Sequence, residues 1–151
     1  MKDWDKRFLS LAQHIAGWSK DPSTKCGAVI VRGKRIVSLG FNGFPAGTRD
    51  DQSLYLDREE KYRRVIHAEQ NAMAFANCDL TGCTIYVWPF HPCSQCAAMI
   101  VQRGVSRVVT APASADLVDR WGASLESAMG LLEEGGVQLS ILHIEGTPMS
   151  A

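Results

Sequence analysis

The chain has 151 residues, of which 46% are hydrophobic and 21% are charged, the composition of an ordinary globular domain. Sixteen basic residues balance sixteen acidic residues, so the chain lacks the excess positive charge with which most nucleic-acid-binding proteins hold a phosphate backbone. No segment is apolar over the length that a bilayer requires. We therefore expect a single domain over residues 1–151 that acts on a small molecule, with neither nucleic acid nor membrane as a partner.

The N-terminal third predicts a helix followed by a hairpin. Large apolar residues recur every three or four positions from Trp4 to Trp18, which predicts an amphipathic helix that packs on a sheet. Two β-rich runs follow at residues 26–31 and 35–41, and the short polar connection between them favours an antiparallel hairpin. Glycine, proline and consecutive acids at residues 42–53 predict a long loop, which is a frequent place for function.

The rest of the chain alternates helical and strand patterns. Acids stand four positions before bases in three pairs that favour a solvated helix, namely Asp57/Lys61, Glu59/Arg63 and Glu60/Arg64. Further helices are predicted at residues 67–76, 93–103 and 124–134, and strands at 84–88, 105–110 and 137–144. This order predicts an α/β fold whose first strands form an antiparallel hairpin, whose later strands run parallel, and whose site lies at the carboxyl ends of strands.

Three residues have the types and the spacing of a catalytic zinc site. His67 offers an imidazole, and Cys93 and Cys96 form a C-x-x-C pair at a predicted helix start. Three protein ligands leave a fourth tetrahedral position open for water, whereas a structural site normally has four. Glu69 follows His67 by two positions, so both reach one site only if they lie in the first turn of a helix. The motif thus predicts a helix N-terminus at the metal, with Glu69 as the general acid and base.

Other interpretations of these residues exist. C-x-x-C is also the spacing of thioredoxin-like redox pairs, and a zinc site can belong to an interaction module without turnover. The odd total of five cysteines, together with an N-terminus that has no apolar signal core, favours a cytoplasmic protein with metal-binding or core cysteines over a disulfide framework. Cys78 and Cys83 have no neighbouring histidine that would complete a second zinc site.

His67-Ala68-Glu69 and Pro92-Cys93-Ser94-Gln95-Cys96 spell H-x-E and P-C-x-x-C, the pair of motifs that is the signature of zinc nucleobase deaminases. The chain resembles the cytidine deaminase superfamily and, within it, the deoxycytidylate (dCMP) deaminases over nearly all of its length. Three further stretches carry that narrower resemblance, namely Ser19-Lys20-Asp21-Pro22, Gly40-Phe41-Asn42-Gly43-Phe44-Pro45 and His67-Ala68-Glu69-Gln70-Asn71-Ala72. One departure is the stretch Trp88 to His91, which looks one residue longer than is common.

The resemblance implies the three-layer α/β/α cytidine deaminase-like fold with a mixed five-stranded sheet, and zinc-dependent hydrolysis of dCMP to dUMP and ammonia. It implies that Asn42 bonds the sugar and that the Ala68 main chain meets the pyrimidine. Basic residues beside these loops are candidates for the phosphate, namely Lys20, Lys25 and Arg49.

The resemblance also implies a homo-oligomer, a hexamer or a dimer, with dCTP and dTTP as effectors. The alternatives within the superfamily are deaminases of cytidine, deoxycytidine or 5-substituted dCMP, and of adenosine in tRNA. The neutral charge of the chain speaks against the tRNA enzyme.

Overall fold

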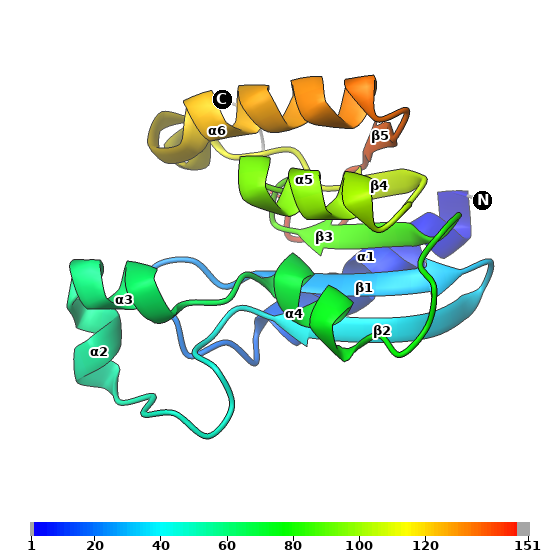
Figure 1. Ribbon diagram of the computed structural model, residues 1–151. Helices are drawn as coiled ribbons and strands as arrows, with labels where there is room; N and C mark the ends of the chain where they lie inside the picture. The colour runs from blue at the N-terminus through cyan, green and yellow to red at the C-terminus, as the bar shows by residue number, and fades with distance from the viewer. Residues whose placement is uncertain (1, 148–151) are drawn as a thin grey trace.

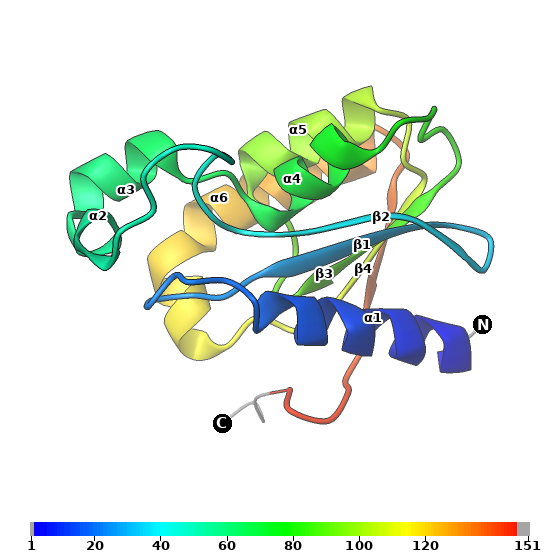
Figure 2. The same ribbon diagram turned by 90° about the horizontal axis from the view of Figure 1, so that it is seen from below.

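A computed structural model describes residues 2–147 and has one mixed sheet between two helical layers (Figures 1 and 2). The strand order is β2-β1-β3-β4-β5. The strands are β1 (Gly27–Arg32), β2 (Arg35–Phe41), β3 (Thr84–Trp88), β4 (Arg107–Thr110) and β5 (Gln138–Ile141). Strand β1 pairs antiparallel with β2 and β3, and β3, β4 and β5 are mutually parallel neighbours. The expected mixed five-stranded sheet of the deaminase-like fold is confirmed.

Successive side chains of a strand point to opposite faces of the sheet, so the hydrophobic core is divided into two clusters, one on each face. The helices are α1 (Lys2–Ala16), α2 (Gln52–Leu56), α3 (Arg58–Arg64), α4 (Ala68–Phe75), α5 (Ser94–Gln102) and α6 (Ala115–Glu134). Val29 and Val31 of β1 face α1, whereas Ala28 and Ile30 face the core that α4, α5 and α6 cover. Figure 2 shows α1 alone on one face and these three helices on the other. The three-layer α/β/α prediction is confirmed.

Helix α4 packs closely on β2, which fixes the start of that helix relative to the sheet. A Cβ atom on Gly40 would lie 2.5 Å from the backbone nitrogen of Ala72, so only glycine permits this approach. The Ser38 hydroxyl donates to the Ala72 carbonyl at 2.7 Å. The Asn71 side chain donates to the Phe41 carbonyl at 2.8 Å. Together these contacts hold the segment that carries His67 and Glu69.

Two predictions about helices are wrong in extent. The first helix ends at Ala16, so Trp18 lies beyond it with 53% of its surface exposed instead of packing on the sheet. Helix α6 begins at Ala115 rather than at residue 124, and the Ser114 hydroxyl caps it by accepting from the Leu117 N–H. Gly122 interrupts the helical pattern in the sequence, but buried leucines on both sides of it hold the helix together.

Helices α2 and α3 lie beyond the ends of the strands, apart from the two layers (Figure 1). Helix α2 includes the last residues of the predicted loop, and α3 is the predicted charged helix. Within residues 2–147 no helix has both the length and the apolar character needed to cross a membrane.

Candidate active site

The start of α4 brings His67 and Glu69 to the end of the sheet. A two-residue bridge between Gly43 and Ile66 aligns the chain just before the helix. His67 is the N-cap residue, and its N–H donates to the Gln70 side chain at 2.9 Å. Glu69 is the second residue of the helix and is buried. The predicted helix N-terminus at this point is confirmed, which lets an imidazole and a carboxylate two positions apart approach one site.

The start of α5 brings the two cysteines to the same point. Cys93 is the N-cap residue of α5, and Cys96 is the third residue of the helix. Both are buried. The partial positive charge at a helix N-terminus stabilises thiolates, so the local structure suits metal-ligating sulfur.

The imidazole and the two sulfur atoms are arranged as ligands of one ion. The His67 Nδ1 atom lies 3.4 Å from the Cys93 sulfur and 3.3 Å from the Cys96 sulfur. Nitrogen and sulfur atoms bound to one tetrahedral zinc at about 2.1 and 2.3 Å lie roughly 3.6 Å apart, so little movement would be needed to bind the ion. No fourth His, Cys, Asp or Glu ligand atom joins this group in the described part of the chain. The donor set therefore fits zinc with one open position.

The electrostatics of the three groups show two thiols that compete for a proton. Hydrogen bonds from Cys96 and from His67 lower the pKa of Cys93 to about 4, whereas the adjacent Cys93 sulfur and burial raise the pKa of Cys96 well above its usual range. The hydrogen bond to Cys93 raises the pKa of His67. Metal binding needs both thiolates and a neutral imidazole, so it displaces the remaining protons and grows stronger as pH rises.

Glu69 lies beside this group without being part of it. Burial raises the pKa of its carboxyl group, and the negative charge of Cys93 adds to the effect while His67 opposes it. Glu69 takes part in no ion pair among residues 2–147. A buried carboxyl group without a paired cation is suited to accept and release a proton.

A cavity of about 360 Å³ opens over these residues. His67, Glu69 and Cys93 lie in its wall, together with Asn42 and Ala68. The cavity is further lined by residues of α2, α3 and α6, namely Tyr55, Leu56, Arg58, Lys61, Tyr62, Arg120 and Trp121. This cavity, whose lining includes two of the three potential metal ligands and the buried Glu69 carboxyl group, is large enough for a small-molecule substrate.

A family model for the cytidine and deoxycytidylate deaminase zinc-binding region matches residues 2–112. The chain belongs to this family. Zinc is accordingly the metal of this deaminase, and His67, Cys93 and Cys96 form a group that could hold it.

Two relatives show how far the similarity of this deaminase extends. It is 44% identical over 142 residues to a protein of Aliivibrio fischeri named uncharacterized deaminase in the luxG 3′ region, and the match covers 94% of this chain and 95% of the relative. It is 40% identical over 114 residues to human deoxycytidylate deaminase, which covers 71% of this chain and 64% of the human protein. The deaminase thus matches just under two thirds of the length of the human protein.

A solved structure has the same fold as this deaminase. The dCMP deaminase of cyanophage S-TIM5, in its apo form, superimposes with a TM-score of 0.73 over 94% of this chain and 99% of the phage protein, at 24% identity. At that identity the likeness shows the fold, and the roles of individual residues rest on the geometry of the site.

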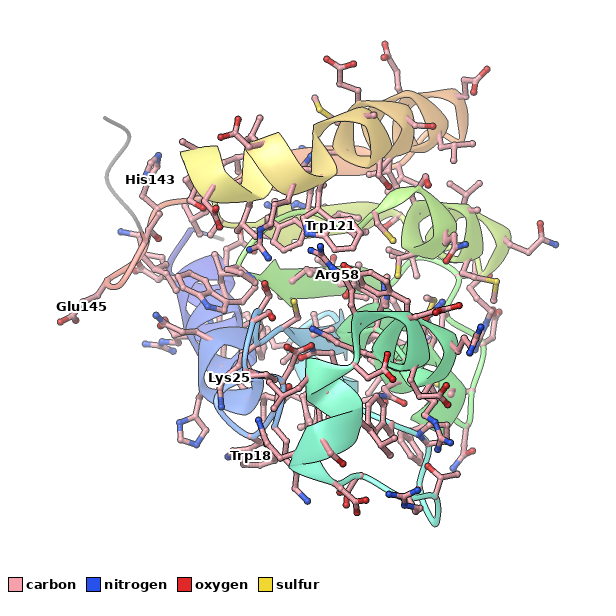
Figure 3. All side chains as sticks on the ribbon, turned by 90° about the vertical axis from the view of Figure 1, so that its left-hand side faces the viewer. Trp18, Lys25, Arg58, Trp121, His143 and Glu145 are labelled. Atoms are coloured by element: carbon pink, nitrogen blue, oxygen red, sulfur yellow. The ribbon has the colours of Figure 1, made fainter. Side chains whose placement is uncertain are left out.

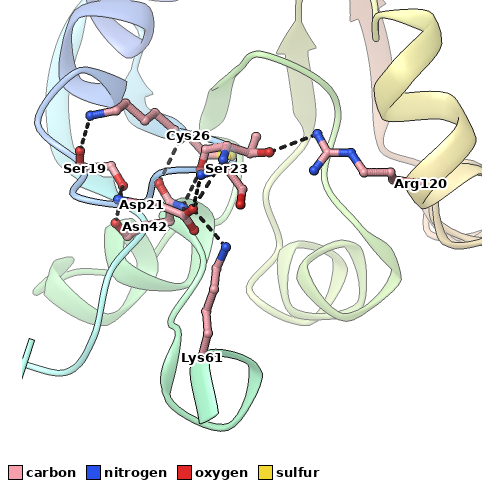
Figure 4. Close-up of polar contacts among 9 residues, drawn as sticks. Ser19, Asp21, Ser23, Cys26, Asn42, Lys61 and Arg120 are labelled. Atoms are coloured by element: carbon pink, nitrogen blue, oxygen red, sulfur yellow. Dashed lines mark hydrogen bonds and ion pairs between the residues drawn. The ribbon is translucent and has the colours of Figure 1, made fainter. Parts of the chain in front are cut away.

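Asn42 forms hydrogen bonds that hold the loop at residues 19–26 of the deaminase in place (Figure 4). Its side-chain oxygen accepts from the Cys26 N–H at 2.8 Å, and its amide donates to the Thr24 carbonyl at 2.9 Å. Its main-chain carbonyl accepts from the Ser19 hydroxyl at 2.9 Å. Asn42 therefore fixes residues 19–26 while it lines the cavity, and its expected contact with the sugar stays a prediction.

Asp21 is the centre of the same loop. Its buried carboxylate accepts from the Ser23 and Thr24 N–H groups at 2.8 and 3.3 Å and from the Lys61 ammonium at 2.9 Å. The sequence predicts a pair between Lys61 and Asp57, and that prediction is wrong. Asp57 instead caps α3 by accepting from the Glu60 N–H, which leaves Lys61 free to reach a loop forty positions away.

The three basic residues expected at the phosphate are not among those that line the cavity. Lys20 pairs with Asp50, Arg49 pairs with Asp51, and Lys25 donates to the Ser19 carbonyl. The cations that do line the cavity are Arg58, Lys61 and Arg120. Sequence reasoning missed Arg58 and Arg120 because nothing local marks them, and because the predicted helix began only at residue 124, after Arg120.

Proposed function

We propose that this protein hydrolyses dCMP to dUMP and ammonia. The observation that carries the proposal is the group formed by His67, Cys93 and Cys96, with Glu69 beside it in the lining of one cavity. A redox role for the cysteine pair does not account for the imidazole that faces both sulfur atoms. An interaction module without turnover does not account for the buried acid in the lining of a cavity of substrate size.

Each residue of the group has a separate task in this reaction. His67, Cys93 and Cys96 would hold the ion, which when bound acts as a Lewis acid that lowers the pKa of water towards about 7. Glu69 accepts a proton from the attacking water and delivers it to N3 of the pyrimidine as the new C4–O bond forms. Glu69 then takes the remaining proton from the new C4 hydroxyl group and gives it to the amine, so that the C4–N bond breaks as the C4 carbonyl forms and water and dCMP become dUMP and ammonia.

The choice of dCMP rests on relatives and on charge. Curated relatives at about 40% identity carry the name deoxycytidylate deaminase. A structure of the cyanophage S-TIM5 dCMP deaminase, whose fold this chain shares, contains dCMP and dUMP. In the present protein, three cations line the cavity against two acids, Asp21 and Glu69, which suits an anionic nucleotide better than a nucleoside. The Ala68 main chain is our candidate for contact with the pyrimidine, and Asn42 for contact with the sugar.

Further parts of the proposal concern the whole protein. A single deaminase domain over residues 1–151 is supported by the one sheet with a core on each face, although Met1 and residues 148–151 lie outside the described residues. The reducing environment that free metal-binding cysteines need supports a cytoplasmic location. The resemblance to dCMP deaminases supports a homo-oligomer with dCTP and dTTP as effectors, and the balanced charge of the chain supports the absence of a nucleic-acid partner.

Replacement of Glu69 by glutamine tests the function. The Glu69→Gln variant keeps the shape and polarity of the side chain but cannot shuttle protons, so we expect zinc content to stay near one per chain and kcat with dCMP to fall by about 10³-fold or more. The exposed Glu59 on α3 provides the matched control, and Glu59→Gln should retain full activity. Formation of uracil products from dCMP, CMP, deoxycytidine and 5-methyl-dCMP is measured side by side. Undiminished turnover of every compound by the zinc-loaded Glu69→Gln protein would refute the assignment.

A further inference from the structure

A second hollow, which we call the mouth, adjoins the cavity. It is lined by Arg58, Tyr62, Arg120 and Trp121, and all four residues also line the cavity itself. Two come from α3 and two from α6, so the mouth is formed between helices that are far apart in the chain. Figure 3 shows Arg58 and Trp121 next to each other at this point, with Lys25 well to the side. Neither the metal ligands nor Glu69 line this second hollow, so the two arginines line a part of the cavity that is separate from the metal group.

Arg58 differs from the other arginines of its helix because it has no acidic partner. Arg63 and Arg64 pair with Glu59 and Glu60 one turn earlier in α3. Over residues 2–147, Arg58 forms no ion pair, and its guanidinium lies 5.9 Å from the centre of the Tyr62 ring. A guanidinium at the mouth of a cavity, held over an aromatic ring and not neutralised, is available to an anion.

Arg120 approaches the same mouth from α6. Its guanidinium donates to the Thr24 hydroxyl at 3.1 Å, which places it beside the loop that Asn42 fixes (Figure 4). Its acidic partner Asp116 is 77% exposed and does not line the cavity, so this ion pair is weak and screened by solvent. The Ser124 hydroxyl accepts from the Ser94 N–H at 3.1 Å and so ties α6 to the start of α5.

Lys61, the third cation of the cavity, is already neutralised. Its ammonium and the Asp21 carboxylate form a pair in which only 12% and 4% of the side chains are exposed. The charge left at the mouth is therefore that of the two arginines. A phosphate monoester carries a charge of roughly −1.5 to −2 at neutral pH, which two guanidinium groups match.

We propose that Arg58 and Arg120 bind the 5′-phosphate of the substrate, one from each side of the mouth, and thereby select a nucleotide over a nucleoside. This inference rests on the proposed function in taking the pyrimidine to lie at the metal end. The base and the phosphate lie at opposite ends of a nucleotide, and the metal group and the hollow lined by the arginines are likewise separate parts of this cavity. Arginine suits the task because its planar fork meets two phosphate oxygens at once.

Binding of the product tests the inference without requiring turnover. Titration calorimetry on the zinc-loaded protein compares the Kd of dUMP with the Kd of deoxyuridine. The ratio of the two values measures how much the phosphate contributes to binding. We expect Arg58→Gln and Arg120→Gln each to weaken dUMP binding by about 10-fold to 100-fold and to leave deoxyuridine binding unchanged. Arg58→Lys retains the charge but not the planar fork of donors, so its Kd for dUMP should lie between those of wild type and Arg58→Gln.

The matched control is Arg63→Gln, which removes the same charge from the same helix at a position outside the cavity. It should leave both Kd values as in wild type. The inference is overturned if Arg58→Gln binds dUMP as tightly as Arg63→Gln does, or if wild type does not bind dUMP. It is also overturned if the arginine variants lose affinity for dUMP and deoxyuridine to the same extent. If dUMP binding depends on the two arginines while dCMP is not deaminated, the phosphate site stands and the proposed reaction fails.

Discussion

Two buried acids in this protein, Asp5 and Glu69, are exposed to almost the same small extent, 4% and 5%, yet their pKa values shift in opposite directions. The Asp5 carboxylate accepts two hydrogen bonds from Arg107, at 2.9 and 2.8 Å, and one from the Tyr86 hydroxyl at 2.7 Å. The Arg107 hydrogen bonds are the main cause of its lowered pKa. Burial is the main cause of the raised pKa of Glu69. A buried acid with its own cation holds the fold together, whereas one without a cation can exchange a proton.

The surroundings of the two acids differ in the same way. Asp5 and its partners join α1 to β3 and β4 and need nothing from outside the chain. The group next to Glu69 brings together an imidazole and two sulfur atoms that repel one another once both thiols are ionised. That arrangement is stable only with protons or a cation between its members. One region is complete as folded, and the other is built to receive an ion.

The largest effect that this comparison predicts concerns the metal. Replacement of Cys96 by serine substitutes a poor zinc ligand for a thiolate inside a buried site. We expect the zinc content to fall well below one per chain and kcat/KM with dCMP to fall by more than about 10³-fold, or about 4 kcal/mol of transition-state stabilisation. Elemental analysis and uracil formation are the measurements. Cys78→Ser, at an exposed cysteine outside the site, is the control and should change neither quantity.

An effect of intermediate size is expected at Asp5. Asp5→Asn leaves the Arg107 guanidinium partly buried without a counter-ion, which should lower the free energy of unfolding by about 3 kcal/mol. Activity per folded, zinc-loaded molecule should be unchanged because this cluster does not line the cavity. Urea unfolding at pH 7 checks the first expectation. A variant as stable as wild type would show that the ion pair contributes little.

The difference in stability between wild type and Asp5→Asn is also expected to depend on pH. The pKa of Asp5 is lower in the folded protein, so its contribution to stability is fully present above the unfolded pKa of about 3.9 and is lost as pH falls through the folded value. The stability gap between wild type and Asp5→Asn should therefore be constant from about pH 6 to 8 and shrink below about pH 4. Unfolding curves at several pH values measure the gap. A stability gap that widens at low pH would contradict a lowered pKa of Asp5 in the folded protein.

The smallest stability effect is expected at Glu69. Its raised pKa means that the charged form is disfavoured in the folded protein, so its contribution to stability is lost as pH rises through the folded value. Glu69→Gln should therefore leave the stability of the zinc-loaded protein at pH 7 unchanged, or raise it by up to about 1 kcal/mol, while activity is lost. Thermal unfolding checks this. A destabilisation as large as that of Asp5→Asn would place the two acids in the same structural role.

The metal group could be predicted from the sequence because its signals are local. Cys93 and Cys96 are three positions apart, His67 and Glu69 are two apart, and each pair needs only a helix start to be correctly placed. The antiparallel hairpin and the parallel later strands followed in the same way, from β-rich runs, short connections and alternation with helices. Patterns of this kind depend on neighbours along the chain, which the sequence displays directly.

Contacts across the fold were not predictable in this way. Asp5 and Arg107 are 102 positions apart, and Lys61 reaches Asp21 although Asp57 stands at the favoured helical spacing. Arg120 lies at the cavity because the first half of α6 is helical despite Gly122. Burial and packing decided these outcomes, and a single sequence carries little information about either.

The central claim is that His67, Cys93 and Cys96 hold one zinc ion with an open position. X-ray absorption at the zinc edge of the purified protein tests it most directly. We predict two sulfur neighbours at about 2.3 Å, one nitrogen at about 2.0–2.1 Å and one further light atom that is exchanged when a substrate analogue is added. A shell of four protein ligands, a third sulfur neighbour, or a protein without zinc would contradict the account.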